Sequence, residues 1–221
     1  EAPEFAAGIA PVQAAGGIRL RGVVGEGFAR IDLVTTDAER ALAGAAAIFV
    51  AVPAYGHARM AELILPELRG DQVLALTPGN AGGALEFARL LQTVPASRRP
   101  LLAEASSCLF ACKKDGPDGA WVRGLKQGLP VAALPATRTA EALDVLRVPF
   151  PEFGPARDVL ETSLTNVNHV VHPPGILLNL GRVELGQDDW LFFADGLGPA
   201  VCRVMEQVDA ERVEVVRRLG L

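Results

Sequence analysis

The 221-residue sequence is poor in cysteine, histidine and aromatic residues, and it contains no long apolar run. Its three cysteines, Cys108, Cys112 and Cys202, are an odd number without the spacing of a zinc site, so we expect reduced thiols and no bound metal. No apolar run approaches the roughly 20 residues that span a bilayer, and no basic start precedes an apolar stretch as in a signal peptide. The sequence therefore predicts a soluble, cytoplasmic protein without a membrane partner.

Basic residues do not outnumber acidic ones. The chain has 21 Lys and Arg against 26 Asp and Glu, a formal net charge of −5, and no basic stripe that could follow the phosphates of DNA or RNA. We therefore expect no nucleic-acid partner. Half of the residues are apolar, which suffices for the core of one large or two small domains. Because residue 1 is Glu rather than Met, we expect the sequence to be a fragment.

Strand and helix patterns alternate between residues 36 and 104. Buried-strand runs occupy residues 46–52, 72–77 and 101–104, whereas helices are expected after the N-cap Asp37 and over residues 58–68 and 84–91. This alternation predicts right-handed βαβ units and a parallel sheet. Further strands are expected at residues 16–22, 28–35 and 130–134, a hairpin turn at 115–119, and a helix from Thr139.

Prolines 149, 151 and 155 predict a linker, after which the pattern is helical to the end of the chain. We place a domain boundary near residue 150.

Small, flexible residues follow each of the three central strands. In parallel sheets ligands bind at the carboxyl ends of the strands, and these ends correspond to residues 53–57, 77–80 and 104–107. Ordinary turn chemistry explains any one of these loops, but it explains three together less well. A Gly-x-Gly-x-x-Gly motif is missing before Val52, because Gly25-Glu-Gly27 lacks both a preceding strand and a third glycine.

Residues 163–184 have apolar side chains at helical spacing, which predicts that most of the stretch forms one long helix. On such a helix, four polar residues would form a narrow stripe: Thr165, Asn168, His172 and Asn179. Buried amides and imidazoles require hydrogen-bond partners, so the stripe either forms hydrogen bonds within the protein core or faces a ligand. An isolated histidine is more often structural, but its place on the stripe favours a functional role for His172; His169 lies off the stripe and is assigned a structural role. Pro173 and Pro174 should kink or interrupt the helix.

The sequence Glu-Thr-Ser-Leu-Thr-Asn-Val-Asn-His-Val-Val-His-Pro-Pro at residues 161–174, continued by residues 177–184, resembles the signature of the octopine/nopaline (opine) dehydrogenase family. Shorter matches occur in the right order along nearly the whole chain, at residues 35–37, 50–53, 77–79, 103–104, 110–112, 124–130 and 195–201. The resemblance implies an oxidoreductase that uses NADH or NADPH to reduce the imine formed between an α-keto acid and the amino group of an amino acid. It also implies an α/β fold, with a Rossmann-like parallel-sheet domain followed by an all-α domain of the 6-phosphogluconate dehydrogenase C-terminal type. Residues 1–150 would then be a partial dinucleotide-binding domain and residues 151–221 a partial helical substrate and catalytic domain.

The resemblance also implies roles for individual residues. His172 is similar to the family's catalytic acid/base, and Asn168 to a residue that positions the substrate or intermediate. A histidine with a pKa near neutrality can exchange the proton that imine chemistry requires, while the hydride comes from the cofactor. Substrate contacts are expected from Glu104, Cys112 and Asn179, although Lys113 stands where the family often has arginine. Cofactor contacts are expected from Val52, Pro53, Ala54, Thr77, Pro78 and Gly79.

By the resemblance, the glycine-rich loop and first strands should precede Glu1, and the aspartate that pairs with the catalytic histidine should follow Leu221. We therefore expect this chain by itself to bind dinucleotide weakly, to turn over no substrate, and to associate through an open sheet edge beside Val50 and Leu74. A homodimer is expected as the assembly. The sequence identifies neither the two substrates nor the choice between NAD and NADP.

Two other functions remain open. A ketopantoate-reductase-like enzyme would share the architecture, but it typically relies on a lysine in the corresponding helix, and the only lysines are Lys113, Lys114 and Lys126. A non-enzymatic helical interaction module would use the polar stripe to specify register at a dimer contact.

Overall fold

The structure is a computed structural model that describes residues 4, 6–186 and 190–221. The chain forms two compact units, Glu1–Ser163 and Leu164–Leu221. The division falls after residue 163 because a strand and most of a helix beyond the proline-rich stretch belong to the first unit. The functional domains expected at 1–150 and 151–221 stay predictions.

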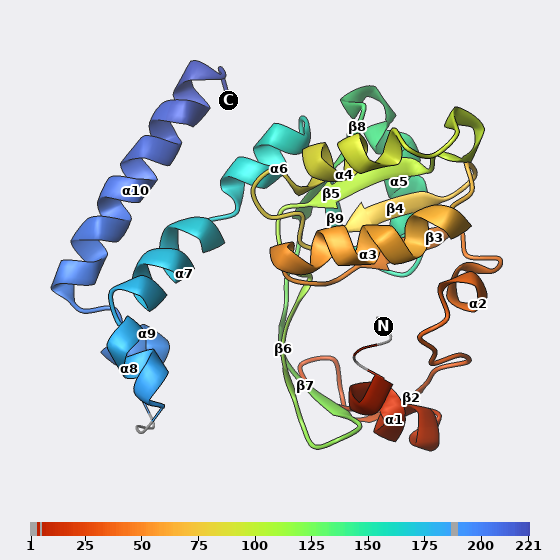
Figure 1. The fold of residues 1–221 in the computed structure, drawn as a ribbon, viewed down its shortest axis with the longest axis horizontal. Coiled ribbons are helices and arrows are strands. Elements are labelled where there is room, and N and C mark those ends of the chain that lie inside the picture. The colour runs from red at the N-terminus through yellow and green to blue at the C-terminus, as the bar shows by residue number, and fades with distance from the viewer. Residues whose placement is uncertain (1–3, 5, 187–189) are drawn as a thin grey trace. The chain divides into compact units, whose positions relative to one another are not determined.

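A five-stranded sheet in the order β3-β4-β5-β8-β9 forms the centre of the first unit (Figure 1). Its strands are β3 (Ala47–Val50), β4 (Val73–Leu76), β5 (Leu101–Ala105), β8 (Leu129–Leu134) and β9 (Phe153–Pro155). The first three are parallel neighbours, as predicted. β8 runs antiparallel to β5, because a hairpin rather than a crossover helix connects the two strands. β9 lies within the stretch predicted to be a linker and pairs with β8 in parallel, whereas the elements described after it are all helices, as predicted.

Helices cover both faces of this sheet. One face carries α2 (Ala38–Leu42), α3 (His57–Ile64), α4 (Gly83–Leu91) and the start of α6 (Val159–Thr165), and the other carries α5 (Thr139–Leu146). The carboxylate of Asp37 accepts a hydrogen bond from the Arg40 amide at 3.2 Å, which confirms the predicted N-cap of α2. α3 is shorter than the predicted helix and passes into the 3-10 turn Leu65–Glu67, which contains Pro66.

The core lies on both sides of the sheet because successive strand residues point to opposite faces. Leu74 and Leu76 of β4 pack into the cluster that contains Phe87 of α4, whereas Val73 and Ala75 pack into the cluster that contains Leu146 of α5. All four residues of β4 are buried, as is typical of a central strand in a parallel sheet.

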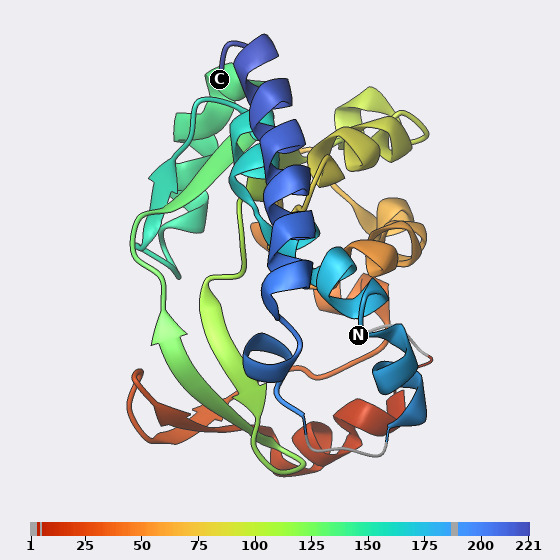
Figure 2. The same ribbon diagram turned by 90° about the vertical axis from the view of Figure 1, so that its left-hand side faces the viewer.

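A second sheet, in the order β2-β1-β7-β6, completes the first unit (Figures 1 and 2). It consists of β1 (Gly17–Gly22), β2 (Gly27–Arg30), β6 (Phe110–Lys114) and β7 (Gly119–Leu125). The turn between β6 and β7 closes with a hydrogen bond from the Asp115 amide to the Gly119 carbonyl, which confirms the predicted hairpin. The sequence did not predict α1 (Ala6–Ala15), which includes a glycine and Pro11 and has little amphipathic pattern.

β3 forms an edge of the five-stranded sheet, because among the described residues it pairs only with β4. Val50 therefore lies on an open edge, as predicted. The same prediction was wrong for Leu74, since β4 is hydrogen-bonded to β3 on one side and to β5 on the other.

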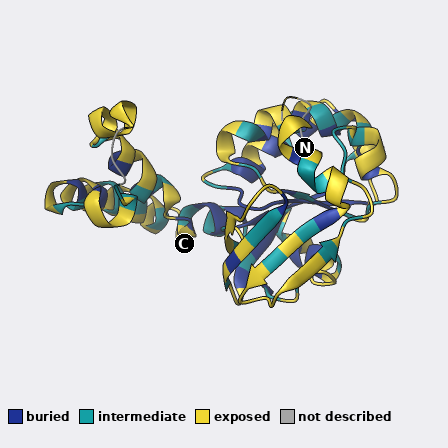
Figure 3. Cartoon of the chain, turned by 90° about the horizontal axis from the view of Figure 1, so that it is seen from below, coloured by how far each residue is buried: buried dark blue, intermediate teal, exposed yellow. Residues whose placement is uncertain are grey.

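The second unit consists of helices: α7 (Asn168–Leu177), α8 (Leu180–Leu185), α9 (Phe192–Asp195) and α10 (Pro199–Arg218). Its small core joins Val170 of α7 to Val201 and Met205 of α10, and most other side chains are exposed or half-buried (Figure 3). In the described part of the chain, no helix combines the length and apolar character needed to cross a membrane.

The prediction of one long helix over residues 163–184 was wrong, because the stretch is divided among α6, α7 and α8. The side chain of Asn166 accepts a hydrogen bond from the Asn168 amide at 2.9 Å, and such a local bond competes with helix continuation. The two prolines do not interrupt the helix, since α7 continues through Pro173 and Pro174 to Leu177, and the alternative of a kink stays a prediction.

Candidate functional site

The residues predicted to contact the cofactor lie at the carboxyl ends of strands in the five-stranded sheet. Val52, Pro53 and Ala54 follow β3, and Thr77, Pro78 and Gly79 follow β4. Because β3, β4 and β5 are parallel neighbours, these loops meet at the carboxyl end of the sheet, where ligands bind in such folds. Hydrogen bonds join them to the adjacent strands, from the Thr77 amide to the Val50 carbonyl at 2.9 Å and from the Gly79 amide to the Ala105 carbonyl at 3.2 Å.

Glu104, near the end of β5, is fully buried. Its Oε1 accepts hydrogen bonds from the hydroxyls of Thr162 and Ser163, each at 2.7 Å, and its Oε2 accepts one from the Ala84 amide at 2.7 Å. Burial raises the pKa of the carboxyl, whereas these three hydrogen bonds act in the opposite direction. The expected contact of Glu104 with the amino-acid substrate stays a prediction, and the partners observed here all belong to this chain.

His57, at the start of α3, lies beneath the loop that follows β4. Only 1% of the residue is exposed, and its ring packs edge-on to Phe87 with 5.9 Å between centroids. The ring donates a hydrogen bond to the Pro78 carbonyl, and among the described residues its Nε2 has no partner. Burial lowers the pKa of the imidazole, opposed by the nearby carboxylate of Glu86. His57 is therefore a neutral ring that supports the loop.

The lowered pKa of His57 predicts a loss of stability in mild acid. As the pH falls below about 6.5, the unfolded chain takes up a proton on this residue that the native chain resists, so the free energy of unfolding should decrease. Burial also lowers the pKa of His169, with Arg212 as a second cause, and this histidine acts in the same direction. Urea unfolding between about pH 7.5 and 5.5 should show a smaller pH dependence for His57→Gln than for the wild type. Equal slopes for the two proteins would contradict a neutral His57. Because Glu104 is common to both, its raised pKa, which acts with the opposite sign, does not affect the comparison.

Asn80 is a loop residue whose role the sequence did not predict. It is the non-glycine residue with a positive φ, 56°, among the described residues, and its buried Nδ2 has no hydrogen-bond partner there. Left-handed backbone is unfavourable for most side chains but tolerated by asparagine, and strained residues cluster at functional sites. The Asn80-Ala-Gly-Gly sequence after a strand was the available signal. Asn80 therefore offers an unused amide donor at the ligand edge of the sheet.

In the second unit, the structure brings Asn168 and His172 together on α7. They are separated by one helical turn, so they lie on the same face of the helix, and both are exposed. The His172 ring lies 5.5 Å from the ring of Phe192 and 6.1 Å from that of Phe193, both on α9. The predicted pair of a proton-exchanging imidazole and a neighbouring amide thus forms within one short helix.

The other members of the polar stripe lie elsewhere. Thr165 ends α6, and Asn179 precedes α8. The side-chain amide of Asn179 donates to the carbonyls of Gly175 and Gly196, each at 2.8 Å, so both of its donors connect segments of the second unit. The four-residue stripe on a single helix was therefore wrong, and the substrate contact expected of Asn179 stays a prediction.

Cys112 lies on β6 and is exposed, with its thiol free. It lines an apolar cavity of about 310 Å³, to which Thr77 and Cys108 also contribute. The remaining lining residues are Phe49, Ala51, Leu109, Phe110, Phe150 and Phe153. The cavity thus joins a predicted substrate residue to a predicted cofactor residue, and its wall suits an uncharged group.

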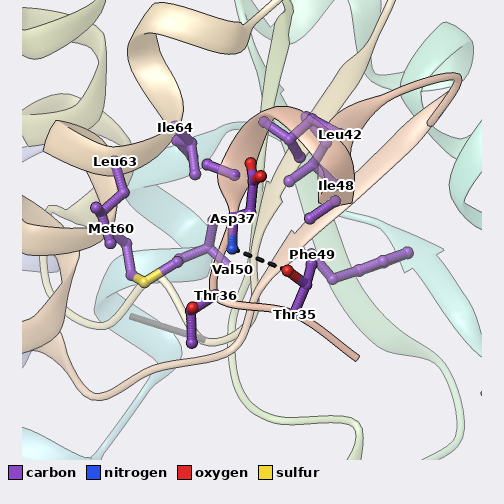
Figure 4. Close-up of a pocket in the computed structure, with 12 residues that line it drawn as sticks. Thr35, Thr36, Asp37, Leu42, Ile48, Phe49, Val50, Met60, Leu63 and Ile64 are labelled. Carbon is purple, nitrogen blue, oxygen red and sulfur yellow. Dashed lines mark hydrogen bonds between the residues drawn. The ribbon is translucent and has the colours of Figure 1, made fainter. Parts of the chain in front are cut away.

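A smaller cavity of about 150 Å³ lies between α2, α3 and the open edge strand β3 (Figure 4). Its polar residues serve the start of α2, where the Thr35 hydroxyl accepts a hydrogen bond from the Asp37 amide at 3.0 Å. Ile48, Val50 and Met60 are among its apolar lining residues. The cavity is therefore explained by the packing of α2 and α3 against β3, and we assign it no ligand.

The first unit fits part of a dinucleotide. Loops of small residues suit the close approach of a ligand, and the buried Nδ2 of Asn80 has no described partner beneath them. The N-terminus of α4 does not suit a pyrophosphate, because Glu104 and Ser163 already accept from the Ala84 and Gly82 amides. Across residues 4, 6–186 and 190–221, no cluster of three His, Cys, Asp or Glu side chains could hold a metal ion.

Comparison with known proteins agrees with this arrangement. Residues 155–221 match the alpha-helical domain of NAD/NADP octopine/nopaline dehydrogenase. The opine dehydrogenase of Arthrobacter sp. (strain 1C) is 36% identical over 213 residues, which cover 96% of this chain and 59% of the relative. The chain thus spans little more than half the length of that protein.

Two solved structures share the fold. An octopine dehydrogenase in complex with NADH and agmatine superposes with a TM-score of 0.65 at 21% identity, over 86% of this chain and 48% of that one. A ketopantoate reductase from Ralstonia eutropha JMP134 superposes with a TM-score of 0.64 at 16% identity, over 99% of this chain and 65% of that one. At these identities both show the α/β architecture alone. Residues 155–221 match the alpha-helical domain of the octopine/nopaline dehydrogenase family, and the similarity to an opine dehydrogenase extends over nearly the whole chain.

Proposed function

We propose that this chain acts in an NAD(P)H-dependent opine dehydrogenase, which reduces the imine formed between an α-keto acid and the amino group of an amino acid. The observation that carries the proposal is the exposed Asn168 and His172 pair on α7, within the segment that matches the family's helical domain. α7 contains no lysine, which disfavours a ketopantoate-reductase-like reaction.

His172 acts as the general acid and base. Imine formation releases water from the carbinolamine, and reduction leaves a secondary amine, so protons must be given and taken at the carbonyl oxygen and the nitrogen. An imidazole side chain can both give and take a proton. Asn168, one turn earlier on the same face, can donate its amide hydrogens to a carboxylate or carbonyl of the substrate and can hold the reacting atoms beside the ring.

Cofactor contacts come from the strand-end loops of the first unit, at residues 52–54 and 77–79, with Asn80 as an additional donor. When bound, NADH or NADPH supplies the hydride that reduces the imine carbon. Glycine at position 79 allows close approach of the backbone, and the buried His57 and Glu104 hold the loop from beneath. The cavity lined by Thr77 and Cys112 accepts an uncharged part of a ligand.

The remaining expectations from the sequence also stay proposals. We place the enzyme in the cytoplasm, because its three thiols are free. We propose a homodimer, since the second unit exposes large apolar side chains, such as Leu185 and Phe193 at 68% and 69%. The only other partners that we propose are small molecules, an amino acid and an α-keto acid.

The identity of the product tests the proposed reaction. The enzyme should be incubated with NADH or NADPH and with panels of amino acids and α-keto acids, and the products analysed by mass spectrometry. An opine dehydrogenase yields a secondary amine that contains the carbon skeletons of both substrates. A 2-hydroxy acid, formed from the keto acid alone, would contradict the proposal and support the ketopantoate-reductase-like alternative.

Asn80 provides a test of the cofactor loop. Asn80→Gly keeps the left-handed backbone but removes the amide donor, so we expect unchanged or slightly higher stability together with NADH affinity that is lower by about fivefold to tenfold. Asn80→Asp keeps the shape and lacks the donor, and it should weaken binding similarly. Fluorescence titration with NADH measures the affinities. If Asn80→Gly binds NADH as tightly as the wild type, Asn80 does not contact the cofactor.

A further inference from the structure

We infer that Glu104 is a positioning residue for the loop of residues 77–83 and does not contact the amino-acid substrate. The inference deepens the proposed function, because it rests on the assignment of this loop to the cofactor. It replaces the substrate contact that the resemblance to the family implied for Glu104.

The hydrogen bonds of Glu104 connect three segments that are far apart in the sequence. Its Oε2 accepts from the amide of Ala84, directly after the loop, and its Oε1 accepts from Thr162 and Ser163 at the end of α6. Each of these distances is 2.7 Å, which is typical of bonds to an ionised acceptor. One carboxylate thus fixes the end of the loop and the residues immediately before the second compact unit.

Ser163 extends this connection to the loop itself. Its hydroxyl donates to Glu104 and accepts from the Gly82 amide at 3.1 Å. The loop residues just before α4 are therefore held directly by Ala84 and indirectly through Ser163. Because Gly82 has a φ of 83°, which L side chains rarely adopt, these contacts maintain a conformation that few sequences favour.

Gly79 packs against the other side of the carboxylate. A Cβ placed at this position would overlap the Cγ, Cδ and Oε2 atoms of Glu104. The absence of a side chain at residue 79 is therefore required by the position of Glu104, and the loop backbone lies directly on the carboxylate. Any displacement of Glu104 must also displace a residue that we assign to the cofactor contact.

A substrate contact is hard to reconcile with this environment. The residue has 0% exposure, and its two oxygens already accept three hydrogen bonds from this chain. A substrate ammonium group could reach the carboxylate only if Gly79 or the end of α6 moved away. Such a movement would break hydrogen bonds that the buried carboxylate of Glu104 accepts from this chain, which is unfavourable.

Two substitutions of Glu104 distinguish positioning from substrate binding. Glu104→Gln keeps the shape; its oxygen can accept from Ala84, and its amide can donate to the hydroxyls of Thr162 and Ser163, which also act as acceptors. Glu104→Leu removes the acceptor of all three hydrogen bonds. For a positioning residue, Glu104→Leu in the complete enzyme should weaken NADH binding by about tenfold or more and should raise KM equally for both substrates, while Glu104→Gln stays within a few-fold of the wild type.

For a substrate contact, the charge itself is required. Both variants would then raise KM for the amino acid alone and leave NADH affinity unchanged, which would overturn the inference. A lower Tm with unchanged affinity and unchanged KM values would also overturn it, because it would indicate a purely structural role. NADH titration requires no turnover, so failure to find an opine substrate would count against the proposed function and would leave this comparison intact.

Milder variants extend the test if Glu104→Leu does not fold. Ser163→Ala removes two hydrogen bonds, the one to Glu104 and the one from the Gly82 amide, and should weaken NADH binding by about fivefold or more. Thr93→Val is the matched control, because its hydroxyl donates to the Leu90 carbonyl near the far end of α4. It should leave NADH affinity unchanged. Equal effects of Ser163→Ala and Thr93→Val would contradict the proposed link.

Discussion

In the complete enzyme, replacing His172 with alanine should lower kcat by about 100-fold or more while the fold remains intact, because general acid–base catalysis typically contributes that much. The side chain is exposed on α7, and its described aromatic contacts are Phe192 and Phe193, so its removal should change stability little. Steady-state kinetics and thermal unfolding measure the two effects separately.

His169 provides the control for this substitution. It lies on the same helix, half-buried beside Arg212 and Asp209, and we assign it no part in the reaction. His169→Ala should therefore keep kcat within a few-fold of the wild type. If His172→Ala retained similar activity, the acid/base would have to be another residue.

Gly79→Ala should have a large effect on the first unit. The added methyl group would overlap the buried carboxylate of Glu104, which three hydrogen bonds hold in place. Overpacking of this kind typically costs about 1–3 kcal/mol, and relief of the overlap would move the cofactor loop. We therefore expect a lower Tm and a large loss of NADH affinity.

Gly181→Ala is the matched control, because a Cβ at that position of α8 meets no atom within 4 Å. It should leave Tm and NADH affinity unchanged or slightly raise the stability. A Gly79→Ala protein with the Tm and NADH affinity of the wild type would show that the loop is not packed against Glu104 as described.

The first unit was largely predictable from local patterns. Strand and helix periods between residues 36 and 104 are strong, and prolines and glycines separate them, so β3, β4, β5, α2 and α4 form close to where they were predicted. The direction of β8 was not evident, because it depends on the hairpin that precedes it. α1 was missed because its apolar residues surround the helix instead of forming one face.

The second unit shows why periodicity misled the prediction of a single helix. The apolar spacing of residues 163–184 is helical throughout. However, the Asn166 side chain accepts a hydrogen bond from the Asn168 amide, where α7 begins, and the Asn179 side chain donates to the carbonyls of Gly175 and Gly196. Such competition between side chain and backbone is not visible in hydrophobic spacing. Asn168 and His172 were still placed correctly together, because one helical turn is enough to bring them to one face.

The environment of Glu104 was equally invisible in the sequence. A carboxylate at the end of a strand suggested a ligand contact, but its partners Thr162 and Ser163 are 58 and 59 residues away. Only the fold reveals that they enclose it. The sequence could therefore locate the ligand edge of the sheet, whereas the role of each side chain depends on long-range packing.

The central proposal is that the enzyme in which this chain acts joins two substrates during reduction. The most direct test is to follow NADH or NADPH oxidation with an amino acid alone, an α-keto acid alone and both together. The proposed function predicts negligible oxidation with either substrate alone and rapid oxidation with both, and this activity should be lost in His172→Ala. Oxidation at the same rate with the keto acid alone would contradict it.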